Sequence, residues 1–150
     1  MPDPSEHARL IERGLAIHEE RAYADALPLL ERTHALAPRC PSAIYNLANT
    51  LFMLDREREA YDLLRQIIDC DDEQLRKGCP DGPVSPASYK LDAYFLLFLV
   101  VLYGTEDWDD AFAYAQEHLR RRRRGLRSLW TRQQVLAEIR ELRAGFAEHT

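Results

Sequence analysis

The chain has 150 residues, of which 46% are hydrophobic and 30% are charged, with a formal net charge of -5. A chain of this length and composition buries enough surface for one globular domain with its own core. Because nucleic-acid-binding domains are usually basic, the acidic balance argues against a general polyanion binder, and we expect no nucleic-acid partner. The N-terminal stretch MPDPSEHARLIERG is polar and lacks the apolar segment of a signal peptide, so we expect a cytoplasmic protein.

The cysteines and histidines do not indicate a metal or disulfide site. Cys40, Cys70 and Cys79 are an odd set without Cys-x-x-Cys spacing, so we expect free thiols, with neither a disulfide framework nor a zinc site. The histidines are scattered, and none has a second histidine four positions away. No metal or cofactor is therefore predicted.

The first two predicted helices have clear start and stop signals. Asp3 suits an N-cap and a proline follows it, so the first helix is predicted from Pro4 to Glu20. In the second helix, Pro28 favours a late start with Asp25 as N-cap, because proline is tolerated within a first turn. Pro38 ends this helix.

A second pair of helices is predicted at Pro41–Leu54 and Glu57–Cys70. Several acidic residues follow its second helix. We expect Asp71 or Asp72 to begin a short helical turn through Lys77; a cation site is the alternative, but the glycine-containing spacing of a calcium loop is missing.

The stretch Gly78–Ser88 contains three prolines and two glycines, which predicts a loop. Ser85 then caps a new helix, in which the run Ala93–Tyr103 is apolar without a break. This run is too short to span a bilayer. A helix with apolar side chains on every side must be buried on every side by other parts of the protein. Gly104 is predicted to end it, and Thr105 to cap the helix that follows.

That following helix is predicted to continue to about Arg124 and to close with the arginine run Arg120–Arg124. We interpret the run as a solvated helix end, because consecutive residues fan around a helix and cations favour its C-terminus. Contact with an acidic protein or a nucleic acid is the alternative. Ser128 is predicted to cap a last helix with the apolar stripe Leu129, Leu136, Ile139, Leu142 and Phe146.

The helix pairs repeat with a period of 34 residues. The equivalent apolar and small positions are Leu10, Gly14, Ile17, Ala26 and Leu30 in the first copy, and Ile44, Ala48, Leu51, Ala60 and Leu64 in the second. The third copy follows the second after 51 residues, so it is preceded by an insertion of 17. Small residues at these places allow two helices to cross closely, and each pair leaves an apolar face for the next pair to cover.

This unit resembles the tetratricopeptide repeat, whose anchor, small residue, aromatic, alanine and helix-ending proline are matched in order by Leu10, Gly14, Tyr23, Ala26 and Pro38. The second unit has Glu57 for the aromatic and Asp72 for the proline, and the third matches at Phe95, Leu102, Trp108 and Ala111 but has Leu99 for the small residue.

The resemblance implies an all-α, right-handed superhelical solenoid of three helix pairs plus a C-terminal capping helix. The three repeats would lie at about 7–40, 41–74 and 92–125, with an insertion at about 75–91 and the capping helix at about 128–148.

The first helix of each pair would line a concave groove. The peptide-binding residues predicted there are Tyr45, Asn46, Asn49, Phe52 and Met53, with Glu12, His18 and Glu19 at the acidic end, and Leu96, Leu97, Val100 and Tyr103 at the apolar end. Asn46 and Asn49 are one helical turn apart, so both amides can bind a peptide backbone. The alternative is that these residues pack against the chain's own final helix.

By this resemblance the chain is a noncatalytic adaptor or chaperone-like module whose partner is another protein or peptide, with no membrane. The basic clamp by which some members hold a chaperone tail is absent, because its places carry Ile11, Leu15, Asn46, Ala93 and Leu97. A type III secretion-type chaperone, or a homodimer or larger homo-oligomeric scaffold held through 93–103, are the alternatives. An enzyme is not expected, because no nucleophile or phosphate-binding loop accompanies His18 and Glu19.

Overall fold

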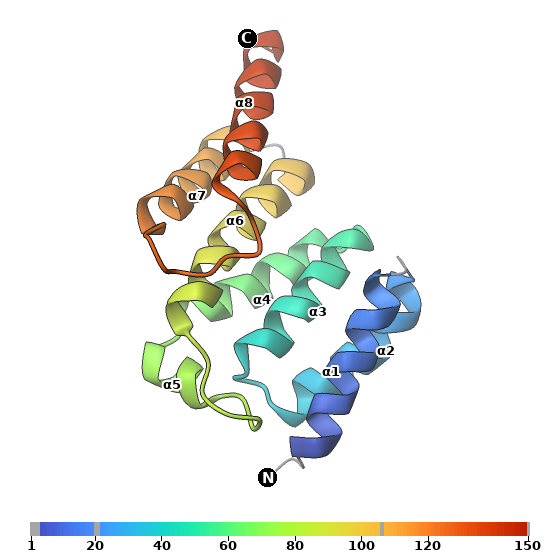
Figure 1. Ribbon diagram of the computed structural model, residues 1–150. Helices are drawn as coiled ribbons and strands as arrows, with labels where there is room; N and C mark the ends of the chain where they lie inside the picture. The colour runs from blue at the N-terminus through green and yellow to red at the C-terminus, as the bar shows by residue number, and fades with distance from the viewer. Residues whose placement is uncertain (1–3, 20–21, 106, 150) are drawn as a thin grey trace.

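The computed structural model describes residues 4–19, 22–105 and 107–149, and it assigns eight helices and no strand to them (Figure 1). The helices are α1 (Pro4–Glu19), α2 (Tyr23–Leu36), α3 (Pro41–Met53), α4 (Glu57–Asp69), α5 (Asp72–Lys77), α6 (Pro86–Thr105), α7 (Trp108–Arg121) and α8 (Arg132–His149).

The long helices form three pairs, α1 with α2, α3 with α4 and α6 with α7, and each pair packs on the next. In Figure 1, α1, α3 and α6 lie toward the viewer, and α2, α4 and α7 lie behind them. The last helix, α8, packs on α7 and extends away from the rest of the molecule. The predicted all-α architecture of repeated helix pairs is thus confirmed.

Small residues allow the helices to cross closely. Ala26, Ala60 and Ala111, which are equivalent in the three pairs, have no exposed surface. Gly104 is a further close approach, because a Cβ atom there would lie 2.8 Å from Cβ of Glu57 on α4. We predicted that Gly104 ends its helix; it lies within the last turn of α6, where its role is to let α4 approach.

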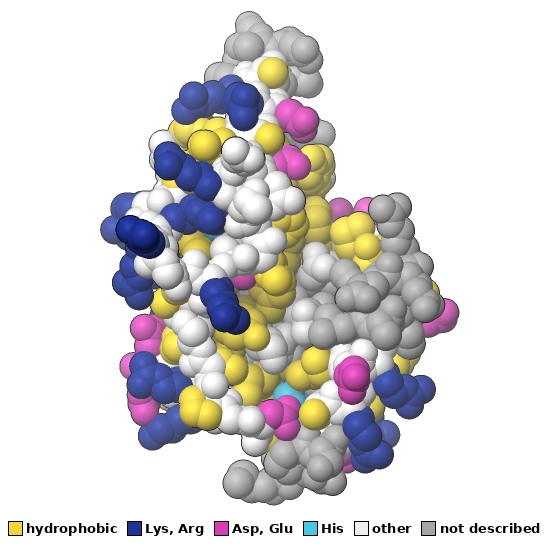
Figure 2. Space-filling model, in the orientation of Figure 1, with side chains coloured by type: hydrophobic (Ala, Val, Ile, Leu, Met, Phe, Trp, Pro, Cys, Tyr) yellow, Lys and Arg dark blue, Asp and Glu magenta, His cyan; other side chains and the backbone are white. Residues whose placement is uncertain are grey.

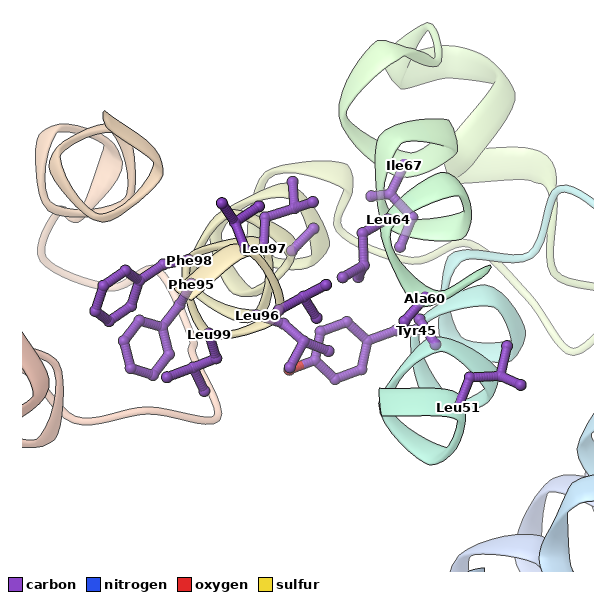
Figure 3. Packing of buried hydrophobic residues seen from close by; sticks show 14 of the residues in the cluster. Tyr45, Leu51, Ala60, Leu64, Ile67, Phe95, Leu96, Leu97, Phe98 and Leu99 are labelled. Carbon is purple, nitrogen blue, oxygen red and sulfur yellow. The ribbon is translucent and has the colours of Figure 1, made fainter. Parts of the chain in front are cut away.

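Helix α6 is the centre of the core, between α4 and α3 on one side and α7 on the other (Figure 3). Phe95 and Phe98 point toward α7, and Leu97 points toward Leu64 and Ile67 of α4 (Figure 3). The helix starts at Pro86 and so has 20 residues, which by length and composition could cross a membrane. From Leu91 to Val101, however, every side chain except Tyr94 is buried, as predicted for a core helix, whereas Tyr103 near the end of α6 is exposed.

The predicted starts of α2, α7 and α8 are wrong, and α2 has no side-chain cap at all. Helix α2 begins at Tyr23, with the Ala22 carbonyl accepting from Asp25 N at 3.0 Å, and it tolerates Pro28 in its interior because that residue is exposed. The carbonyl left without a donor by the proline ring belongs to Ala24, which is also exposed.

Helix α7 is capped by Asp107, whose side chain accepts from Asp110 N at 3.1 Å, and not by Thr105. Helix α8 starts at Arg132, after a reciprocal cap in which Thr131 and Gln134 exchange hydrogen bonds of 2.8 and 3.1 Å. Ser128, the predicted cap, binds elsewhere. The predictions for α5 and α6 are confirmed, because Asp71 caps α5 and Ser85 Oγ accepts from Ser88 N at 3.3 Å.

The prediction of free thiols is wrong for two of the three cysteines. Cys40 and Cys79 form a disulfide with their Cα atoms 4.3 Å apart, and Cys70 is free. The segment of residues 78–85, which we call the disulfide loop, folds back onto the start of α3, so cysteines 39 positions apart meet. Spacing along the chain cannot reveal such a meeting, because it depends on where the inserted loop packs.

Candidate peptide-binding face

The second half of α3 carries polar and apolar side chains that are not fully buried. Asn46, Asn49 and Phe52 are half-buried, and Met53 is 46% exposed. Among the described residues, none forms a hydrogen bond with the Asn46 amide. Phe52 also lies beside Tyr103 of α6, with ring centroids 6.3 Å apart. These side chains form a mixed polar and apolar surface that joins α3 to the end of α6.

Tyr45, which we predicted to be a peptide contact, is buried, with 5% of its surface exposed. Its ring lies between α3 and α6 beside Leu96 (Figure 3). Its hydroxyl accepts a hydrogen bond of 3.4 Å from Trp130 Nε1, and burial raises the pKa of that hydroxyl. Tyr45 is therefore part of the core and not of the exposed surface.

Trp130 belongs to the segment of residues 122–131, which we call the arginine loop and which crosses in front of α6 in Figure 1. The Trp130 ring meets Phe95 edge to face at 4.8 Å. We considered that the final helix covers part of the groove; the loop before that helix does so, while α8 packs on α7. We predicted a helix from Ser128 onward, which would include Trp130, and this role of Trp130 was therefore missed.

The side chain of Asp92 on α6 holds the arginine loop by hydrogen bonds. Its carboxylate accepts hydrogen bonds from the hydroxyl of Ser128 and from the backbone N of Leu129, the latter at 3.2 Å. Burial raises the pKa of this carboxyl, and the bonds from Ser128 and Leu129 act against the rise. Ser128 therefore anchors the loop to α6 instead of capping α8.

His118 connects the same loop to α7. It is fully buried, and its Nδ1 lies 2.7 Å from the carbonyl oxygen of Leu91, so Nδ1 is the protonated nitrogen, because a carbonyl can only accept. Nε2 then accepts from Arg122, at 3.1 Å, and Arg122 also donates to the Trp130 carbonyl at 3.0 Å. Burial lowers the pKa of His118, so the ring is held neutral.

The predicted apolar end of the groove is mostly closed. Leu96, Leu97 and Val100, which we expected on the concave face, are at most 2% exposed and pack inside the helix array. Tyr103 is the exception, with 61% of its surface exposed. The predicted homo-oligomeric contact through 93–103 loses its basis here, because the apolar face that was to bind a second copy is already covered.

Acidic side chains border the open part of this face. Burial raises the pKa of Tyr103 first, and the nearby charges of Glu138 and Glu141 on α8 raise it further. Burial and the charge of Glu141 also raise the pKa of Glu138. Glu12 of α1 is exposed. The open surface therefore has acidic side chains beside Tyr103, on the side of α8.

His18 lies outside the described side chains, and so does Glu19, so the two remain untested predictions. Among the described residues there is no group of three or more His, Cys, Asp or Glu side chains placed to hold a metal ion. The acidic residues near α5 are already engaged: Asp71 caps the helix, and Asp72 and Glu73 pair with lysines or arginine.

Comparison with known proteins agrees with this helix pairing. Residues 18–77 match the family model of the tetratricopeptide repeat, and a search of curated proteins found no match. Repeats of this family generally mediate protein–protein interactions and are typically noncatalytic. The match covers the second helix of the first pair, the whole second pair and α5. Residues 18–77, which include all of α3, are therefore similar to the tetratricopeptide repeat.

Proposed function

We propose that the chain is a noncatalytic adaptor or chaperone-like module that binds a peptide segment of a partner protein on the open surface of α3 and the end of α6. The surface consists of Asn46, Asn49, Phe52, Met53 and Tyr103. We call it the open face.

The observation that carries this proposal is the exposure of large apolar side chains beside amides. Met53 and Tyr103 are 46% and 61% exposed, whereas the residues of α6 from Phe95 to Val101 are buried. Exposed apolar side chains that lie together, with polar groups around them, are typical of interaction sites. The Asn46 and Asn49 amides can each donate to and accept from a peptide backbone, while Met53 and Phe52 supply adaptable contact area.

The acidic side chains beside Tyr103 indicate the chemistry of the bound segment. Glu138 and Glu141 on α8 are close enough to raise the pKa of Tyr103. A segment with apolar residues flanked by lysine or arginine complements this arrangement in both shape and charge. Tyr45 contributes indirectly, because its buried ring packs between α3 and α6.

The test is selection from a library of random peptides displayed on phage, followed by anisotropy measurements with the enriched peptides. We expect sequences that combine apolar and basic residues. The Asn46→Ala and Met53→Glu substitutions should each weaken the enriched peptides about tenfold, since a central contact contributes on the order of 1–2 kcal/mol.

Gln66→Ala is the matched control, because it removes an exposed amide from α4 on the other side of the molecule. It should leave affinity unchanged. If the enriched peptides bind the Asn46→Ala, Met53→Glu and Gln66→Ala proteins as tightly as the wild type, the open face is not the binding site.

A further inference from the structure

The arginine run does not fan around a helix, as its sequence position predicted. Helix α7 ends at Arg121, and the backbone of Arg122 is already extended. Gly125 has a φ of +87°, and Leu126 N donates to the Arg123 carbonyl at 3.1 Å, so the chain turns back on itself there. This turn returns the chain to the start of α8, where Arg132 lies.

The turn gathers arginines around one pocket of about 460 Å³. Its lining consists of Arg122, Arg123, Arg124, Arg132 and the apolar side chain of Leu119. We call it the arginine pocket. Side chains from three places in the chain, the end of α7, the arginine loop and the first turn of α8, therefore converge on the same space.

The charge of the pocket is not neutralised within the described part of the molecule. Glu117 pairs with Arg120 and Arg121, which lower the pKa of that carboxyl to about 2, so its charge is already used outside the pocket. Among the described residues, Arg123, Arg124 and Arg132 have no ion-pair partner. Between Glu117 and Glu138 the chain has seven arginines and no acidic residue.

Part of the pocket is also held in place before any ligand arrives. Arg122 donates to His118 Nε2 and to the Trp130 carbonyl, so it links the two ends of the arginine loop. A site whose shape is set in advance loses less conformational freedom on binding, which favours a defined ligand over loose counterions.

We propose that the arginine pocket binds an acidic segment of a partner protein, one that carries clustered Asp or Glu side chains next to an apolar residue. Guanidinium groups bind carboxylates with paired hydrogen bonds. Leu119 in the pocket lining supplies apolar contact. Figure 2 shows Lys and Arg side chains gathered over α7 and the loop that follows it. This site is separate from the open face and has the opposite charge preference.

A protein segment fits the pocket better than a nucleic acid does. The pocket is the size of a few side chains, and the chain as a whole carries a net charge of -5, which repels an extended polyanion beyond the arginine cluster. Glu117 and Glu138 flank the arginine-rich stretch in the sequence. A short acidic segment can bind the arginines without lying against either of these glutamates.

The experiment measures binding of a short fluorescein-labelled peptide of Asp and Glu residues with two leucines, and of its Asn and Gln counterpart. The full-length wild type should bind only the acidic peptide, and binding should weaken as salt rises from about 50 to about 300 mM. A variant with Arg123→Gln, Arg124→Gln and Arg132→Gln should bind it about tenfold more weakly, as three exposed ion pairs are lost.

The matched control carries Arg13→Gln, Arg39→Gln and Arg58→Gln, three exposed arginines on other elements, and it changes the net charge equally. It should bind the acidic peptide like the wild type, as should the open-face variant Met53→Glu, which separates this proposal from the proposed function. Circular dichroism establishes that each variant is folded.

Three results would overturn the proposal. The first is absence of saturable binding, or equal weakening in the control and the pocket variant. The second is tighter binding, through the same arginines, of an oligonucleotide of equal charge or of acidic phospholipid vesicles. The third is a salt-dependent dimer in sedimentation that the pocket variant abolishes, which would assign the pocket to a second copy of the chain.

Discussion

Two loops interrupt the regular helix pairs, and they are attached to the molecule in different ways. The disulfide loop is fixed to α3 by the Cys40–Cys79 bond and to α1 by an ion pair of 2.8 Å between Asp81 and His7. The arginine loop is held by hydrogen bonds to Asp92 and by the packing of Trp130 on Phe95. The first depends on a covalent bond, and the second on polar and aromatic contacts alone.

This difference indicates which conditions release each loop. Reducing agents act on the disulfide loop and leave the contacts of the arginine loop untouched. Acid acts on the arginine loop through His118, whose neutral form accepts the bond from Arg122. The two loops are held by separate sets of contacts, so each can be released separately while the helix pairs stay folded.

The largest effect is expected from Gly78→Ala in the disulfide loop. A Cβ atom at this position would lie 2.0 Å from the backbone oxygen of Arg39, and backbone atoms cannot move aside cheaply. We expect a loss of about 4 kcal/mol in the free energy of unfolding, measured with urea. Gly82→Ala has space but a φ of +130°, so it should cost only about 1 kcal/mol. Equal losses would contradict the steric explanation.

The second-largest loss of stability is expected from Trp130→Ala, because this substitution removes the aromatic contacts that hold the arginine loop. We expect a loss of about 3 kcal/mol, since large aromatic side chains cost this much when truncated in packed surroundings. Hydrogen exchange should rise at residues 126–130 and stay unchanged in the disulfide loop. Leu129→Ala on the same loop is the control, because that side chain is 70% exposed and should change stability by less than about 0.5 kcal/mol.

The Cys40–Cys79 disulfide should contribute somewhat less to the free energy of unfolding than the Trp130 side chain does. Replacing Cys40 and Cys79 together with alanine should lower the free energy of unfolding by about 2 kcal/mol, because the unfolded chain regains the freedom of a long closed loop. Dithiothreitol should destabilise the wild type by a similar amount and leave the double variant unaffected, and Cys70→Ala should respond like the wild type. Since the cytosol reduces such bonds, alkylation of thiols in the native cells also tests the predicted cytoplasmic location.

The smallest effect is that of pH on the arginine loop. The pKa of His118 is lower in the folded than in the unfolded protein, so its stabilisation is complete above the ordinary value of 6.5 and is lost as pH falls below it. Asp92, whose pKa is raised, acts in the opposite direction, because its protonation favours the folded state. The wild type should therefore lose more stability than His118→Gln between about pH 7 and about pH 5 in urea titrations. Parallel curves would exclude His118 as the titrating group.

The sequence predicted the helix pairs well, because their packing repeats. The equivalent helix crossings are occupied by Ala26, Ala60 and Ala111. The repeat pattern in the sequence identified these three residues, and all of them are buried in the structure. Caps that depend on neighbouring residues, such as Asp71 on α5, could also be predicted, since both partners are local.

The parts that could not be predicted depend on where loops pack. Tyr45 has the same phase on α3 as residues of the open face, but it is buried beside Leu96 of α6 and bonded to Trp130, 85 positions away. Cys79 likewise reaches Cys40 only because the inserted loop folds back. An insertion has no counterpart in the other repeats from which its position could be inferred. Neither contact can therefore be predicted from the spacing of residues.

The Cys40–Cys79 bond has a mechanical consequence for this chain. It closes a ring that contains α3, α4 and α5, including most of the open face. Tension applied between the two termini would pass from Cys40 directly to Cys79, so the backbone between them would carry no load. The second helix pair would then keep its shape while the flanking helix pairs were pulled apart. A single proteolytic cut inside the ring would leave the two fragments joined.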